Sequence, residues 1–346
     1  MSTATTPRAR RAGAGLTSTT IVYAVLALVV VVSAVLTASE GRNFFSQGNT
    51  WAVLTAMSVL GLIAIGQTLV ILAGSLDLSV PYVVSLATLI AADGMKGVDA
   101  NLAPAVVNTL ALTALIGLMM GLIVTLLDVH GFIASLGVGL VVSGYLASTY
   151  QGSSGTSSPD LNLLGRSGIG GIIPASFLIM LGCAAAVIAM LRFTRLGHHL
   201  FAVGGSRPVA RMSGLRTATP VIAAHVLCSV LAGLAGLMLL SRTGVGIPTI
   251  GSQGRYDLLS IAAVVLGGTL LAGGKGSVVG TIGGVAIFAV LDNVMSVMQV
   301  NPFLKDFVRG LVIVLAVAVY ARRSIVRRPP RFGHASPLGA VLKEDS

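Results

Sequence analysis

Apolar stretches of membrane-spanning length recur along almost the whole of this 346-residue chain. A helix needs about 20 predominantly apolar residues to cross the hydrocarbon core of a bilayer, so stretches of this length predict transmembrane helices. They are residues 20–38, 51–73, 79–95, 103–127, 131–150, 172–192, 218–241, 256–272, 277–298 and 303–321. We therefore expect an all-α fold, a polytopic membrane helical bundle of about ten transmembrane helices.

The charge composition favours a membrane protein over other classes. Only 10% of the residues are charged, whereas a soluble domain carries about 25%. The net charge of +11 could suit a nucleic acid, but the arginines lie at the ends of apolar stretches and form no long basic face. We therefore expect no nucleic-acid partner, and the spans leave no room for a soluble enzyme domain.

Positive residues predict the orientation of the bundle, because they concentrate in the cytoplasmic segments of membrane proteins. Dense clusters lie near both termini and in one central loop, whereas the other connections carry scattered cations. The first apolar stretch resembles a secretory signal, but the spans that follow favour a retained helix. We expect a cytoplasmic N-terminal tail at 1–19, a transmembrane domain at 20–321 with a cytoplasmic loop at 193–217, and a cytoplasmic C-terminal tail at 322–346.

The loop 193–217 contains the signals of a short helix. Ser206 is a favourable N-cap, Pro208 suits a first helical turn, and Gly214 suits a left-handed residue after the last turn. These residues predict a helix at 207–213 that lies along the membrane surface. Two helical turns are unstable alone in water, so a partner protein or the bundle must hold them. Anchoring of the arginines to lipid headgroups is the alternative.

Two apolar runs are interrupted. Residues 71–84 contain a glycine, an aspartate and a proline, and residues 266–280 contain a glycine-rich turn around Lys275. Broken helices in the two halves of a transporter point to its transport site, and two ordinary tight turns explain the pattern equally well. The lysine turn lacks the first glycine and the final Ser or Thr of a phosphate-binding loop, so the chain is not expected to bind ATP.

Few polar side chains lie at or near membrane depth, where such groups are candidates for function. They are Gln67, Asp77, His225, Asp257, Asp292 and Asn293. Asp77, Asp257 and Asp292 stand close to span ends, so helix capping is their alternative role. No series of acidic residues and histidines suggests a proton relay, and the pair His198–His199 is a weak metal candidate. Cys183 and Cys228 are expected to be packing residues. Small residues at four-residue spacing predict close helix contacts: Gly117, Gly121, Gly276, Gly280 and Gly284.

Five stretches carry a family resemblance. They are GQTLVILAGSLDLSV (66–80), GFIASLGVGLVVSG (131–144), TRLGHHLFAVGGSRPVARMSGL (194–215), YDLLSIAAVVLGGTLLAGGKGSVVGTIGG (256–284) and GLVIVLAVAV (310–319). In order and spacing they resemble the membrane permeases of bacterial ATP-binding cassette (ABC) importers of the ribose and branched-chain amino acid class. The ribose-type sugar permeases are the most similar.

This resemblance implies a type II-like permease fold in a bacterial plasma membrane, with both termini cytoplasmic. It also implies three partners: a second permease copy (the same chain or a paralogue), cytoplasmic ABC ATPase subunits and an extracytoplasmic solute-binding protein. The chain would bind no cofactor and would not be an enzyme, since the partner ATPase uses the ATP. It would form the translocation pathway for a ribose-like monosaccharide.

The resemblance further implies that the short helix is the coupling helix, seated in a groove of the ATPase. Its candidate coupling residues are Gly204, Gly205, Arg207, Ala210, Arg211, Ser213 and Gly214. The candidate residues of the translocation pathway are Gln67, Asp77, Ser79, Tyr256, Asp257 and Asn293. The chain departs from the family where Ser206-Arg207-Pro208-Val209-Ala210 replaces Asn-Glu-x-Ala-Ala, so the acidic residue is absent. Val80-Pro81 and Asp292-Asn293 replace Val-Gly and Asn-Asn.

Other functions stay open on the sequence alone. An ABC permease of this class could carry branched-chain amino acids, nucleosides or a furanose signal instead of a sugar. An ion-coupled secondary transporter would need no ATPase. An intramembrane enzyme is disfavoured, because the chain lacks paired catalytic side chains at membrane depth.

Overall fold

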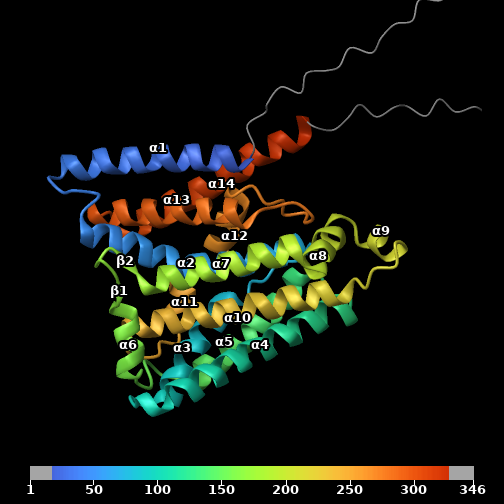
Figure 1. Cartoon of the computed structure of the whole chain (residues 1–346), viewed down its shortest axis with the longest axis horizontal. Coiled ribbons are helices and arrows are strands. Elements are labelled where there is room, and N and C mark those ends of the chain that lie inside the picture. The colour runs from blue at the N-terminus through green and yellow to red at the C-terminus, as the bar shows by residue number, and fades with distance from the viewer. Residues whose placement is uncertain (1–17, 327–346) are drawn as a thin grey trace, which may run out of the picture.

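Ten helices follow the ten apolar stretches in order in the computed structural model, which describes residues 18–326 (Figure 1). They are α1 (Ser18–Ser39), α2 (Gln47–Leu72), α3 (Val80–Met95), α4 (Leu102–Leu126), α5 (Gly131–Thr149), α7 (Ala175–Phe193), α10 (Ala218–Thr243), α12 (Tyr256–Leu266), α13 (Val278–Val297) and α14 (Pro302–Val326). Within the described residues, seven are long and apolar enough to cross a membrane alone: α1, α2, α4, α5, α7, α10 and α13. The all-α prediction is confirmed, while the number of membrane crossings stays a prediction.

Shorter elements lie at the two ends of the bundle. One end holds α8 (Arg195–Gly205) and α9 (Arg207–Met212), and the other holds α6 (Pro159–Arg166) (Figure 1). The antiparallel pair of β1 (Gly168–Ile169) and β2 (Ile173–Pro174) follows α6, with Gly168 opposite Pro174. The remaining short helices are η1 (Asp99–Asn101) and α11 (Ile250–Gln253). The connection 151–171 is therefore partly ordered, because Ser158 caps α6 by accepting a hydrogen bond from Leu161 N.

Both described chain ends lie at the end of the bundle that carries α8 and α9 (Figure 1). This arrangement agrees with an even number of crossings. The expected tails lie largely outside the described residues, since the structure begins at Ser18 and ends at Val326. Helix α14 continues beyond the expected boundary at residue 321, up to Val326.

Glycines set the helix crossings around α10, which packs against α2, α3 and α4. A Cβ at Gly117 or Gly121 of α4 would lie 2.6 Å from main-chain atoms of α10. A Cβ at Gly66 of α2 would lie 2.8 Å from the Cα of Cys228 on α10. Close backbone approach of this kind is how helices associate in lipid. The packing role predicted for Gly117, Gly121 and Cys228 is confirmed.

The C-terminal half contains a second set of close contacts. Gly280 and Gly284 of α13 face the backbone of Gly267 and Ala263, at the end of α12. Gly276 does not belong to this helical face, since it lies in the connection before α13 and faces Thr269. The glycine spacing therefore predicted the α12–α13 contact correctly for two of its three positions.

Two of the ten helices that follow the apolar stretches are too short to span a membrane alone. Helix α3 has 16 residues and α12 has 11, which correspond to about 24 and 16 Å against a hydrocarbon core of about 30 Å. The continuous span expected at 256–272 is wrong, because α12 ends at Leu266 and a glycine-rich connection follows. Before α12 begins, the chain passes beside α3, where Gly251 of α11 packs against Pro81 of α3. Residues 250–266 thus form two short helices, α11 and α12, in place of one continuous helix.

Candidate coupling and translocation sites

The short helix α9 ends as the sequence predicted. Gly214 has a φ of +79°, which an L-residue with a side chain adopts only with strain. Gly214 N donates to Arg211 O, and Leu215 N donates to Ala210 O at 3.1 Å. These two bonds form a Schellman motif, which satisfies the last carbonyls of the helix. Ser206 stands at the N-cap position, but its side chain makes no capping hydrogen bond.

One face of α9 is buried and the other is exposed. Ala210 is 4% exposed, whereas Val209 is 60% and Met212 is 88% exposed. Arg207 pairs with Asp128, in the turn between α4 and α5, at 3.2 Å. Arg211 also lies at the surface. The helix is thus fixed to the bundle while it presents apolar and basic side chains outward.

The end of α8 touches both interrupted segments through backbone alone. A Cβ on Gly204 would overlap the carbonyl oxygen of Leu72, at the end of α2, and would lie 2.8 Å from Gly274 N. Gly274 N in turn donates to Leu72 O at 3.0 Å. A Cβ on Gly205 would meet nothing within 4 Å. The α2–α3 break, the α12–α13 connection and the base of α9 therefore meet at one point.

Three predicted pathway residues form one polar cluster in the α2–α3 break. Asp77 Oδ1 accepts hydrogen bonds from Ser79 N at 2.9 Å and from Ser79 Oγ at 2.6 Å. With its amide oriented to satisfy both atoms, Gln67 bridges the backbone N and O of Asp77. All three side chains are fully buried. In this conformation they hold the break in place.

His225 of α10 completes this cluster. Its Nδ1 lies 3.6 Å from Asp77 Oδ2, and its Nε2 lies 3.1 Å from Ser75 Oγ. Neither Asp77 Oδ2 nor His225 Nδ1 has a hydrogen-bond partner. A buried ionisable group is tolerated only when a partner compensates it, so the pair ties the break to α10.

Tyr256 and Asp257 lie at the start of α12, next to a network of ion pairs. Arg309 of α14 binds Asp292 of α13 through two nitrogens, at 2.8 and 2.6 Å. Arg309 also pairs with Asp306 at 3.0 Å, and Asp306 pairs with Arg255 at 3.0 Å. Arg255 has a φ of +48° and precedes α12 directly. The network links the beginning of α12 to α13 and α14.

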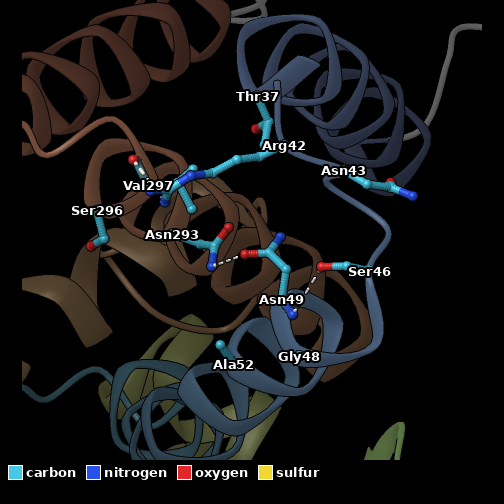
Figure 2. A pocket seen from close by; sticks show the side chains of 10 residues that line it. All are labelled: Thr37, Arg42, Asn43, Ser46, Gly48, Asn49, Ala52, Asn293, Ser296 and Val297. Atoms are coloured by element: carbon cyan, nitrogen blue, oxygen red, sulfur yellow. Dashed lines mark hydrogen bonds between the residues drawn. The ribbon is translucent and has the colours of Figure 1, made fainter. Parts of the chain in front are cut away.

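Asn293, the last predicted pathway residue, lines a cavity of about 580 Å³ at the end opposite α9. Figure 2 shows its side chain facing Asn49 of α2, and Asn293 Nδ2 donates to Asn49 Oδ1 at 2.8 Å. The cavity lies between the end of α1, the start of α2 and the end of α13. The residues that line it are Thr37, Arg42, Asn43, Ser46, Gly48, Asn49, Ala52, Asn293, Ser296 and Val297.

No metal centre emerges in the part of the chain that the structure describes, since no three His, Cys, Asp or Glu side chains group there. His198 Nδ1 lies 2.8 Å from Thr194 O, one turn earlier in the chain. The weak metal candidate at His198–His199 therefore gains no support.

Sequence reasoning missed some of the polar partners. His225 was recognised as a polar residue at depth, but not as the partner of Asp77, because the two are far apart in the chain. Arg309 was not among the polar residues singled out at membrane depth, although its position seven residues into α14 is a signal for a paired charge inside the bundle. Asn49 gave no signal beyond its place near a helix start.

The order of the helices and the short helix after α8 agree with the resemblance stated above. The family model described as branched-chain amino acid transport system / permease component matches residues 49–317. The chain belongs to this permease family. The match extends from the start of α2 into α14, so it includes both broken segments and α9.

Curated relatives are similar over nearly their full length. The ribose import permease protein RbsC of Escherichia coli K12 is 38% identical over 298 residues, 85% of this chain and 91% of that protein. RbsC of Bacillus subtilis is 33% identical, covering 86% and 90%. The xylose/arabinose import permease protein XylH of Sulfolobus acidocaldarius is 30% identical, covering 86% and 85%. No solved structure is significantly similar.

Proposed function

We propose that this chain is the membrane permease subunit of an ATP-driven importer for a sugar, with a ribose-like monosaccharide as the solute. The observation that carries the proposal is the similarity to pentose import permeases over the whole helical bundle.

In this proposal α9 is the coupling helix, and the end of the bundle that carries it faces the cytoplasm. The exposed Val209 and Met212 support a protein contact, since apolar side chains at a membrane protein's aqueous end need a partner. In this proposal Arg207, Ala210, Arg211, Ser213 and Gly214 form α9 and its cap. Gly204 and Gly205 end α8 and connect α9 to the bundle, Gly204 through its close contact with Leu72 and Gly205 through its backbone alone. The Schellman motif and the Arg207–Asp128 pair keep α9 in a fixed orientation for the ATPase.

The proposed mechanism is alternating access driven from α9. When two cytoplasmic ATPase subunits close on ATP, the pull on α9 reaches the end of α8. Because Gly204 touches both Leu72 and Gly274, the same displacement moves both broken segments. A ligand or partner changes a protein's conformation only through contacts that differ between the two conformations. In this proposal, the contacts of Gly204 with Leu72 and Gly274 differ between the conformations with and without bound ATP.

The partners and the location follow from the same proposal. A second permease copy, identical or paralogous, completes the pathway, and an extracytoplasmic solute-binding protein delivers the sugar. The complex lies in a bacterial plasma membrane with both termini of this chain in the cytoplasm. ATP is bound by the ATPase subunits, and this chain contributes neither a cofactor nor a catalytic side chain.

Uptake of tritiated D-ribose into proteoliposomes tests the proposal, with the ATPase and binding protein encoded beside this chain. We expect uptake that needs ATP and is reduced by D-xylose but not by L-leucine. Gly214→Val should reduce uptake at least about tenfold, because a β-branched side chain disfavours the left-handed cap, while the amount of inserted protein stays unchanged. Uptake driven by an ion gradient without ATP, or by L-leucine in place of sugars, would contradict the proposal.

A further inference from the structure

Helix α9 presents a face that is both apolar and basic. Val209 is 60% exposed and Met212 is 88% exposed, and their spacing places them on the same side of the helix. Arg211 stands between them in the sequence and is also exposed. Figure 1 shows α9 beyond the ends of α4 and α10, so this face lies at the outermost part of the bundle end.

Three basic side chains on or next to α9 have no acidic partner within residues 18–326. Arg211 belongs to the helix, and Arg216 follows its C-terminal cap. Lys275 lies next to the base of the helix, because a Cβ on the preceding Gly274 would be 2.5 Å from the backbone of Gly205. All three basic side chains are exposed. Positive charge from three separate segments therefore gathers around α9.

The acidic side chain that contacts α9 in the described part of the chain, Asp128, is already paired. Its Oδ1 accepts a hydrogen bond from Arg207 Nη1 at 3.2 Å. Both side chains are solvent-exposed, at 86% and 41%, so the pair orients α9 more than it stabilises the fold. A single ion pair leaves the three other cations without compensation, and this end of the bundle keeps an excess of positive charge.

The surroundings of Arg211 favour a protein partner over a lipid surface. Anionic lipid headgroups explain cations that stand at the ends of apolar helices, such as Arg192 at the end of α7. Arg211 differs, because its helix projects past the neighbouring helix ends and carries two exposed apolar side chains beside it. Met and Arg are enriched at protein–protein interfaces, where one surface offers both apolar contacts and fixed charges.

We propose that the ATPase receives α9 in an acidic groove, with carboxylates that face Arg211, Arg216 and Lys275. An apolar floor in the same groove covers Val209 and Met212. The inference rests on the proposed function and deepens it by naming the charge of the partner. Like charges across an interface disfavour binding, so this basic end excludes ATPase subunits whose grooves are basic.

Equilibrium binding of the purified ATPase to the chain in nanodiscs of phosphatidylcholine tests the groove, because this lipid has no net charge. We expect the affinity to fall as NaCl rises from about 50 to about 500 mM, since salt screens exposed charges. Arg211→Glu should weaken binding at least about tenfold, because it places like charges opposite each other. Arg211→Gln should have a smaller effect. Both variants should keep the melting temperature of the wild type, as the side chain is exposed.

The matched control is Arg166→Glu, which reverses an exposed arginine of α6 at the opposite end of the bundle (Figure 1). Its affinity for the ATPase should stay within about twofold of the wild type, since its charge lies far from α9. A lysine substituted for an acidic residue of the ATPase groove should restore the binding of Arg211→Glu.

Three results would overturn the inference: unchanged affinity of Arg211→Glu for the ATPase, wild-type binding that does not depend on salt, or a loss confined to phosphatidylglycerol vesicles. The last would assign the arginine to lipid anchoring. If ATP-driven uptake persists in those cases, the proposed function stands and only the acidic groove is rejected. If the wild-type chain binds no ATPase at all, the proposed function fails first.

Discussion

Two adjacent glycines, Gly204 and Gly205, stand in opposite surroundings at the end of α8. A Cβ on Gly204 would overlap Leu72 O, while a Cβ on Gly205 would extend into open space. Both residues lie in the last turn of α8, where a glycine has a similar cost in helix stability at either position. A comparison of the two positions therefore isolates the contact that we consider the route of coupling.

We predict that Gly204→Ala lowers ATP-driven uptake at least about tenfold, because the added methyl group forces the end of α8 away from α2. Gly205→Ala should stay within about twofold of the wild type and should stabilise α8 slightly, as Ala favours helix over Gly. Uptake and ATPase activity in proteoliposomes measure both effects. Equal uptake by the two variants would show that the backbone contact at Gly204 carries no motion.

The contact between Asp77 and His225 is the second contact whose contribution to stability can be measured. Removing one member leaves the other buried without compensation, which destabilises more than removing both. We predict that Asp77→Ala and His225→Ala each lower the melting temperature in detergent, while the double variant loses less than the sum. The coupling energy should be about 0.5–3 kcal/mol.

Leu240→Ala provides the control for that cycle, because Leu240 is equally buried on α10 but lies about four helical turns away from His225. Its effect should add to that of Asp77→Ala with no coupling. Strict additivity between Asp77→Ala and His225→Ala would mean that the two side chains do not stabilise each other.

Helix α14 packs on α12 and α13 and carries much of its attachment in ion pairs. Arg309 binds Asp292 through two nitrogens, a geometry that strengthens an ion pair. We predict that Asp292→Asn and Arg309→Gln each reduce thermal stability and uptake, because the remaining charge loses its main partner. The exchanged pair Asp292→Arg with Arg309→Asp should recover part of both, as measured by melting temperature and uptake. If neither melting temperature nor uptake recovers in the exchanged pair, the orientation of the two charged groups matters more than their attraction.

The elements differ in how well the sequence predicted them. The end of α9 was predictable, because a left-handed glycine and its hydrogen bonds depend on local residues alone. The interruption within 266–280 was indicated by its glycines, but the end of α12 at Leu266 was not, since the turn was expected around Lys275 and the close approach of Gly267 to Gly280 exists only in the folded chain. Local signals predict caps, while long-range packing decides where an apolar helix breaks.

The candidate sites show the same limit. Gln67, Asp77 and Ser79 were predictable as polar residues at depth, and they do come together. Their partner His225 and the cavity around Asn293 depend on contacts between α2, α10 and α13, which the order of residues does not reveal. The sequence therefore indicated which side chains are unusual, and the structure showed which of them meet.

At the level of the whole molecule, the bundle has two different ends. One carries both described chain ends, α8 and the exposed side chains of α9 (Figure 1), and the other carries the cavity beside Asn293 (Figure 2). The dense arginines between residues 192 and 216 belong to the first end, which is the arrangement expected for a cytoplasmic face. A soluble motor would thus act at the end where the two broken segments meet the base of α9, and the solute would enter at the other.

The central claim is that a cytoplasmic ATPase holds the permease through α9. It is tested most directly by a photo-crosslinking amino acid placed at Met212, the most outward side chain of α9, in cells that express the complete transporter. We predict a crosslinked product that contains the ATPase subunit and changes in yield when ATP is bound, with no such product from the same substitution at Leu163, at the opposite end of the bundle. A product with the extracytoplasmic binding protein, or none with the ATPase, would contradict the account.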